Sequence, residues 1–182
     1  MPDYPSKVLQ DAVEAISSLP GVGKRSALRL ALHLLRQPKE NVHHFAGAVS
    51  ALADDIRYCS ECSMVSDGEK CAICADSARD RSVICVVESV RDVMSIENTG
   101  QYHGVNHVLG GIISPINGVG PSDLTIRDLA ARVRALEDPS SAEVILALSG
   151  DVEGETTSFY IYRQSAGTGI RVSSLARGLG FG

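Results

Sequence analysis

Cys59-Ser60-Glu61-Cys62 and Cys71-Ala72-Ile73-Cys74 are the two stretches that decide how the middle of this chain folds. Each Cys-x-x-Cys pair can direct two thiolates at one cation from a single tight turn, and two such pairs complete a tetrahedral sulfur shell that suits Zn²⁺. A closed shell of four thiolates leaves no open position for a reaction. We therefore predict one structural zinc ion per chain, held by Cys59, Cys62, Cys71 and Cys74.

Other uses of paired cysteines fit this sequence less well. Two disulfides would need an oxidising compartment, but no signal peptide opens the chain and a fifth cysteine, Cys85, remains unpaired. An iron–sulfur cluster also takes four thiolates, usually at less symmetric spacing, and a redox motif would use one pair rather than two. We interpret Cys85, inside the apolar run 83–87, as a small buried side chain. His43 and His44 are interpreted as surface or packing residues.

The composition predicts a soluble, cytoplasmic protein with a locally basic N-terminal part. The 182 residues are 44% hydrophobic, and no apolar run approaches the roughly 18 residues of a membrane span. The net charge of −5 hides an asymmetry. No acidic residue lies between Ala15 and Lys39, a stretch that carries five lysines and arginines, whereas 11 acidic residues face seven arginines from Val83 onward. A phosphate partner at the basic end is therefore compatible with the overall charge.

Residues 6–36 predict two helices joined by a glycine turn. Apolar residues recur at helical spacing before and after Leu19-Pro20-Gly21-Val22-Gly23, through which no helix can continue. The glycines allow a ligand to approach the backbone, and amides at the start of the second helix can donate to phosphate oxygens. This pattern resembles the helix-hairpin-helix element of DNA-binding proteins; the alternative is an ordinary αα-hairpin with a solvated basic face. The predicted DNA-binding residues are Gly21, Gly23, Lys24, Arg25 and Arg29.

The second half of the chain alternates between predicted strands and helices. A further helix over residues 41–57 leads into the cysteine pairs, and beyond them the hydrophobic period changes. Strands are predicted at 83–87, 107–109, 144–148 and 170–173, with helices that begin at residue 89 and span 125–136 and 156–164. This alternation predicts an α/β region with a mostly parallel sheet.

Acidic residues are expected at the carboxyl edge of that sheet. Glu88 follows the first strand, and Asp151, Glu153 and Glu155 follow the third. Carboxylates that converge on one edge repel one another unless a cation or a basic partner compensates them. The edge is therefore either a Mg²⁺ site or a docking patch for another protein; in the third interpretation the acids are merely solvated.

The spacing of these acids resembles the Toprim domain of topoisomerases and primases, which holds Mg²⁺ during strand-transfer or phosphoryl chemistry. Here the later motif reads Ser149-Gly150-Asp151-Val152-Glu153-Gly154-Glu155 and departs from the usual Asp-x-Asp. This departure argues against metal-dependent catalysis.

Taken in order, the three regions resemble the RecR family of bacterial recombination mediators. Further agreement comes from residues 58–59, 108–111, 118–121 and 153–155, and the likeness runs from Leu9 to Arg177. The resemblance implies a non-enzymatic, nucleoid-associated protein that forms dimers or tetrameric rings around DNA. It implies that the protein acts with RecO and RecF to load RecA on DNA covered by single-strand-binding protein. It also implies that Arg25 and Arg29 contact DNA, that the four cysteines bind zinc, and that Glu88 is the Toprim glutamate.

The expected organisation has four parts. Residues 1–57 form the helix-hairpin-helix region, 58–81 the four-cysteine zinc finger, 82–177 the Toprim domain and 178–182 a tail. We interpret the tail as shortened or atypical, because family members continue with a further segment that contributes to subunit contacts.

Two other functions compete with the mediator. One is a Mg²⁺-dependent nuclease or phosphotransferase that uses Glu88, Asp151 and Glu153, and the other is a zinc-stabilised adaptor that binds only protein.

Overall fold

The computed structural model describes residues 4–176 and divides into two compact units, Met1–Asp55 and Ile56–Gly182. The expected tail, residues 178–182, lies outside the described residues. The cysteine pairs belong to the second unit, together with the sheet. No helix in the described part of the chain is both long enough and apolar enough to cross a membrane.

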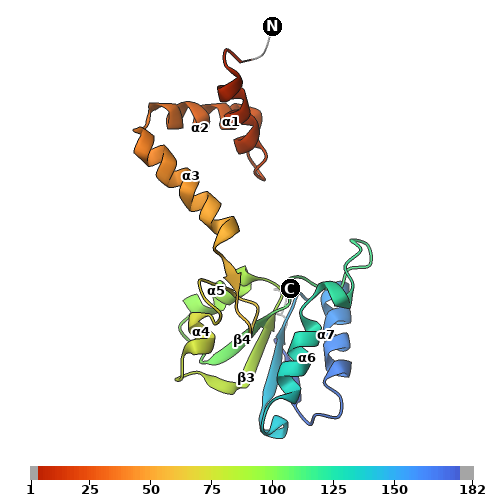
Figure 1. Ribbon diagram of the computed structural model, residues 1–182. Helices are drawn as coiled ribbons and strands as arrows, with labels where there is room; N and C mark the ends of the chain where they lie inside the picture. The colour runs from red at the N-terminus through yellow and green to blue at the C-terminus, as the bar shows by residue number, and fades with distance from the viewer. Residues whose placement is uncertain (1–3, 177–182) are drawn as a thin grey trace, which may run out of the picture. The chain divides into compact units, whose positions relative to one another are not determined.

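The first unit contains three helices, α1 (Lys7–Ser17), α2 (Lys24–Arg36) and α3 (Lys39–Asp54) (Figure 1). The hydroxyl of Ser6 caps α1 by accepting a hydrogen bond from the amide of Leu9. Val13 of α1 packs against Ala27 and Ala31 of α2, all three buried, and the small alanines let the two helices approach closely. Leu35, which the sequence pattern places on the buried side of α2, is 75% exposed, because the contact with α1 runs along Ala27 and Ala31 instead.

Helix α3 has no buried residue. It begins at Lys39, directly after Pro38, rather than at residue 41, and ends at Asp54 because Arg57 already belongs to a strand. Phe45, Val49 and Leu52 recur at helical spacing, which predicts an apolar stripe along this helix, and in the structure each of them is more than half exposed.

The second unit opens with a small zinc region. Strand β1 (Arg57–Tyr58) pairs antiparallel with β2 (Val65–Ser66), and the short helix α4 (Ala72–Ala75) follows. The first cysteine pair lies in the connection between β1 and β2, and the second pair lies at the start of α4. Both pairs are therefore carried on tight turns, as their spacing predicts.

The rest of this unit is a parallel sheet of four strands in the order β4-β3-β5-β6. The predicted α/β fold class is confirmed. Three elements begin three or more residues before the expected position: β3 at residue 80 rather than 83, β4 at 104 rather than 107, and α7 at 152 rather than 156. The elements are β3 (Asp80–Val87), α5 (Val90–Asn98), β4 (Gly104–Val108), η1 (Pro121–Asp123), α6 (Ile126–Arg134), η2 (Pro139–Ser141), β5 (Glu143–Ala147), α7 (Val152–Gln164) and β6 (Arg171–Ser174).

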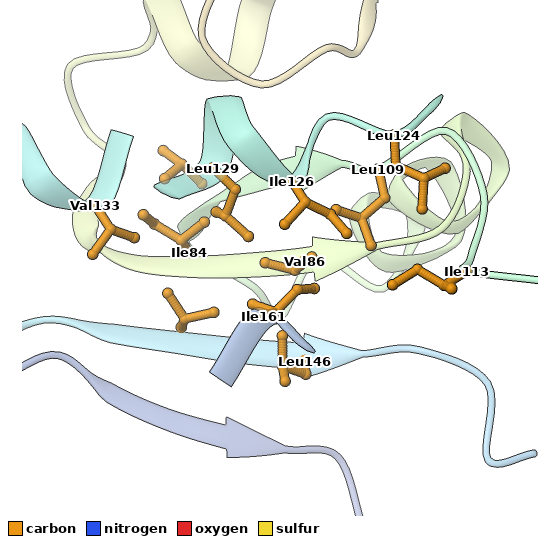
Figure 2. Close-up of a cluster of buried hydrophobic side chains, with 12 residues drawn as sticks. Ile84, Val86, Leu109, Ile113, Leu124, Ile126, Leu129, Val133, Leu146 and Ile161 are labelled. Carbon is orange, nitrogen blue, oxygen red and sulfur yellow. The ribbon is translucent and has the colours of Figure 1, made fainter. Parts of the chain in front are cut away.

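The central strand β3 is buried on both faces, as its continuous apolar run predicts. On one face Ile84 and Val86 lie in a cluster that includes Leu129 of α6 and Ile161 of α7 (Figure 2). Cys85 and Val87 belong to a second buried cluster on the other face, which also contains Val93 of α5. The prediction for Cys85 is confirmed: it is 4% exposed, and burial raises the pKa of its thiol to about 11.

Candidate functional site

The four cysteines form a compact group of sulfur atoms. Their Sγ atoms all lie within 4.8 Å of one another, and each cysteine is at most 5% exposed. Four thiolates around zinc, at Zn–S distances of about 2.3 Å, lie roughly 3.8 Å apart. The Sγ atoms of Cys62 and Cys71 are 3.6 Å apart, so the donor set fits a tetrahedral zinc ion.

Local backbone geometry positions the thiolates. In the first turn, Ser63 has a positive φ of 63° and its amide donates to the carbonyl of Cys59 at 2.9 Å. In the second, Cys71 caps α4, and the amide of Cys74 donates to its Sγ at 3.4 Å. Hydrogen bonding to Cys62, followed by burial, raises the pKa of Cys74 well above the ordinary thiol range. Metal binding must therefore displace a proton from this residue.

The zinc region docks on the edge strand of the sheet. The amide of Val108 in β4 donates to the carbonyl of Cys62 at 2.8 Å. Met64 and Ile73 pack against the cysteines and also against the cluster that contains Val87 and Val93. The ion is thus expected to stabilise both its own loop and the outer edge of β4.

The glycine turn of the first unit leaves the start of α2 open. Gly21 has a φ of +77°, which favours glycine, and the amide of Val22 closes the turn by donating to the carbonyl of Leu19 at 3.1 Å. Gly23 is the N-cap of α2, with no side-chain hydrogen bond, and no acidic residue lies in the first turn. The first amides of α2 therefore have no internal acceptor, and the helix dipole makes this end positive.

The five predicted DNA-binding residues surround this open helix end. Lys24 and Arg25 belong to the first turn of α2, and Arg29 lies about one turn further on. All three side chains are exposed, and none forms an ion pair with a described residue. A Cβ atom at Gly21 or Gly23 would meet open space, so the packing of the chain itself does not require glycine at residue 23. The absence of a side chain at Gly23 leaves room for a ligand to approach the backbone.

Glu88 lies at the carboxyl edge of the sheet, as predicted. Val87 pairs with Ala147 in the neighbouring parallel strand, so the residues after both strands meet at one edge. There a carboxylate oxygen of Glu88 accepts a 2.6 Å hydrogen bond from the amide of Ser149. Glu88 also borders a groove of about 720 Å³ whose walls include Tyr58 and Arg91.

The other three predicted acids are held in different ways. Asp151 caps α7 by accepting from the amide of Gly154 at 2.8 Å, and this bond, with a second from Ser149, lowers its pKa. Glu153 accepts a 2.6 Å hydrogen bond from the hydroxyl of Ser114. Glu155 borders a hollow of about 610 Å³ between β5, β6 and α7. Within residues 4–176, the cysteines are the one group of three or more potential ligand residues whose donor atoms gather.

One network of buried polar side chains in the second unit was not predicted from any sequence pattern. His107 of β4 is fully buried, with its Nε2 atom 3.0 Å from Oγ1 of Thr125. Arg132 of α6 donates to the carbonyl of Asn106 at 2.7 Å. Burial lowers the pKa of His107 to about 4, so the ring is neutral at neutral pH. Its partners are 18 or more residues away in the sequence, and for that reason no local pattern reveals them.

The arrangement defines a protein that combines a helix-hairpin-helix unit, a four-cysteine zinc site and a Toprim sheet. Comparisons with known proteins agree region by region. Residues 9–53 match the family described as RecR, helix-hairpin-helix, residues 56–76 match the four-cysteine zinc finger domain of RecR, and residues 82–176 match the Toprim domain.

Relatives match nearly the whole chain. The Recombination protein RecR of Porphyromonas gingivalis is 53% identical over 179 residues, which cover 98% of this chain and 85% of that protein. Its counterparts in Flavobacterium johnsoniae and Cytophaga hutchinsonii are 51% and 48% identical over 180 residues, which cover 99% of this chain and 86% and 87% of those proteins. The chain belongs to the RecR family of recombination proteins.

Proposed function

We propose that this protein binds DNA without sequence preference, through the sugar–phosphate backbone. The observation that carries the proposal is the uncapped start of α2, where Lys24, Arg25 and Arg29 are exposed and make no ion pair with a described residue. Backbone amides and basic side chains bind phosphates and carry no sequence information. The positively charged helix end supports this assignment despite the acidic net charge.

On this basis we assign the protein a mediator role without enzymatic chemistry. It acts in the cytoplasm, at the nucleoid, with RecO and RecF, and helps load RecA on DNA covered by single-strand-binding protein. The relatives' name, Recombination protein RecR, supports this role. So do the sheet-edge carboxylates, because Glu88, Asp151 and Glu153 each accept a hydrogen bond from a protein donor.

The protein is further proposed to form a homodimer or a tetrameric ring. Phe45, Val49 and Leu52 recur at helical spacing along α3 and are 55%, 55% and 65% exposed. An apolar stripe of this kind on a DNA-binding protein is typical of a subunit contact. A second copy of the same stripe would cover it in a two-fold dimer.

The mediator role is tested by reconstitution. DNA covered with single-strand-binding protein is incubated with RecA, RecO and this protein, and RecA assembly is followed by its DNA-dependent ATPase. We expect the wild type to accelerate assembly and the Arg25→Glu, Arg29→Glu double variant to lose this effect while it keeps its zinc and its fold. Equal acceleration by both proteins would contradict the proposal. Cleavage of labelled DNA with Mg²⁺ that disappears in Glu88→Gln would instead establish an enzyme.

A further inference from the structure

The groove of about 720 Å³ beside Glu88 lies between the zinc region and the start of α5. Tyr58 and Ser63 line it from the zinc region, and Val90 and Arg91 line it from α5. The remaining walls are Glu88, Ser89, Val108, Gly110, Gly111 and Thr125. All of these residues belong to the second unit, so the groove forms within one compact unit.

The backbone around the groove is held in place on both sides. On the sheet side, the amide of Gly110 donates to the carbonyl of Glu88 at 3.0 Å. Gly110 has a φ of +86°, and a Cβ atom there would meet open space, so this wall carries no side chain. On the other side, Tyr58 pairs with Val65 and is followed by the buried zinc ligand Cys59. The groove is therefore formed before a ligand enters it.

Tyr58 presents an uncovered aromatic ring to this groove. Its side chain is 68% exposed, and its hydroxyl makes no hydrogen bond with a described residue. An exposed ring on a fixed backbone is unusual for a folded domain unless a ligand covers it. Aromatic side chains of this kind bind single-stranded nucleic acids by stacking on the bases, which requires no particular sequence because every base has a flat face.

Arg91 supplies an uncompensated positive charge at the same groove. The side chain is exposed and forms no ion pair with a residue in the range 4–176. Glu88 is the other charged residue that borders the groove, and its carboxylate accepts the 2.6 Å hydrogen bond from the amide of Ser149. A phosphate at the groove therefore finds its counter-charge at Arg91.

The charged residues that flank these lining residues in the sequence are paired or directed elsewhere. The three acids have partners: Glu61 with Lys70 and Arg81, Asp92 with the amide of Ser89, and Asp123 with the amide of Gly120. Arg127 borders a different hollow, of about 520 Å³. Arg57 precedes Tyr58 in β1, where successive side chains point to opposite faces of the strand. The zinc-binding thiolates beside Tyr58 are buried.

We propose that this groove binds one unpaired nucleobase of single-stranded DNA, with the base stacked on Tyr58 and an adjoining phosphate on Arg91. A nucleotide combines a flat, weakly polar base with an anion, whereas an apolar peptide would gain nothing from the arginine. In a duplex the faces of the bases are covered by their neighbours, so only a single strand can supply the base. The inference rests on the proposed function, since it adds a preference for single strands to the DNA contact at α2.

The test measures binding of full-length variants to a labelled single-stranded oligonucleotide and to the matching duplex by fluorescence anisotropy. Tyr58→Ala is expected to weaken single-strand binding about tenfold and to leave duplex binding within about twofold of the wild type. Tyr58→Phe keeps the ring and should bind like the wild type, whereas Tyr58→Leu, which is apolar but not flat, should resemble Tyr58→Ala. Tyr162→Ala removes a ring that is 59% exposed on α7 and is the matched control, without effect on either DNA.

A second variant tests the groove away from the zinc ligands. Arg91→Gln should reduce the slope of log K against log salt by about 0.7 for the single strand and leave the duplex slope unchanged. Zinc analysis shows whether each Tyr58 variant keeps its metal. In addition, an oligonucleotide that contains 2-aminopurine, whose emission falls when the base stacks, should be quenched by the wild type and Tyr58→Phe more than by Tyr58→Leu.

Each outcome bears on a different part of the reasoning. If the wild type binds neither form of DNA, the proposed DNA binding and this inference fail together. If the wild type binds the single strand and Tyr58→Ala and Arg91→Gln bind it equally well, the groove is not a base site, and the DNA contact at α2 stands. A Tyr58→Leu variant that matches the wild type, or equal losses on single strand and duplex, would also overturn the inference.

Discussion

Replacing Arg25 and Arg29 with glutamine is expected to lower the salt dependence of DNA binding by a calculable amount. Each lost phosphate contact reduces the slope of log K against log salt by about 0.9 for duplex and about 0.7 for single-stranded DNA. Two contacts per chain therefore change the slope by about 1.8 or about 1.4. Extrapolated from about 1 M salt, the affinity for duplex at about 0.15 M falls roughly thirtyfold, and that for single strands roughly fifteenfold.

The assay is fluorescence anisotropy of a labelled oligonucleotide, titrated at several salt concentrations with wild type and variant. Arg127→Gln is the control, because Arg127 is also exposed and the substitution removes one positive charge, half of the charge lost in the double variant, from α6 in the sheet unit. Zinc content and circular dichroism verify that each variant is folded. If the Arg25 and Arg29 variant keeps the wild-type slope, or if the Arg127 variant loses as much, the assignment of the DNA interface to α2 is wrong.

Three further predictions concern the sheet unit. Cys71→Ser should reduce bound zinc from one ion per chain to nearly none and lower the melting temperature, measured by metal analysis and calorimetry; full zinc content would contradict the four-thiolate site. Gly154→Ala should destabilise the protein by about 3 kcal/mol in urea unfolding, because the new Cβ atom would lie 2.0 Å from the carbonyl oxygen of Ser149. The control is Gly47→Ala in α3, whose Cβ atom would meet open space, and this variant should be as stable as the wild type or more stable. Burial lowers the pKa of His107 to about 4, below its ordinary value of 6.5. The free energy of unfolding should therefore be unaffected by His107 at neutral pH and fall by about 3 kcal/mol as pH falls from 6.5 to 4, because the unfolded chain binds the proton more tightly. His107→Gln should flatten that part of the stability profile relative to wild type, and an unchanged profile would assign the acid sensitivity to other groups.

The sequence alone was sufficient wherever the determinant is local. The spacing within Cys59–Cys62 and Cys71–Cys74 predicts a thiolate site, because two residues between cysteines make one turn, and the structure gathers all four Sγ atoms. Pro20 and the two glycines predict the break between α1 and α2, because a proline and a positive φ cannot belong to a helix. The apolar run 83–87 predicts the doubly buried strand β3 for the same kind of reason.

Tertiary structure alone decided which side chains meet across long stretches of sequence. The sequence places Glu88 and Glu153 at one edge of the sheet, but only the packed loops show that one binds the amide of Ser149 and the other the hydroxyl of Ser114. Leu35 and Ile116 have the same apolar character as core residues, and their exposure depends on whether another element covers them. Burial is a property of the assembled fold, so hydrophobicity along the chain indicates which residues can be covered, and only the packing of distant elements determines which ones are.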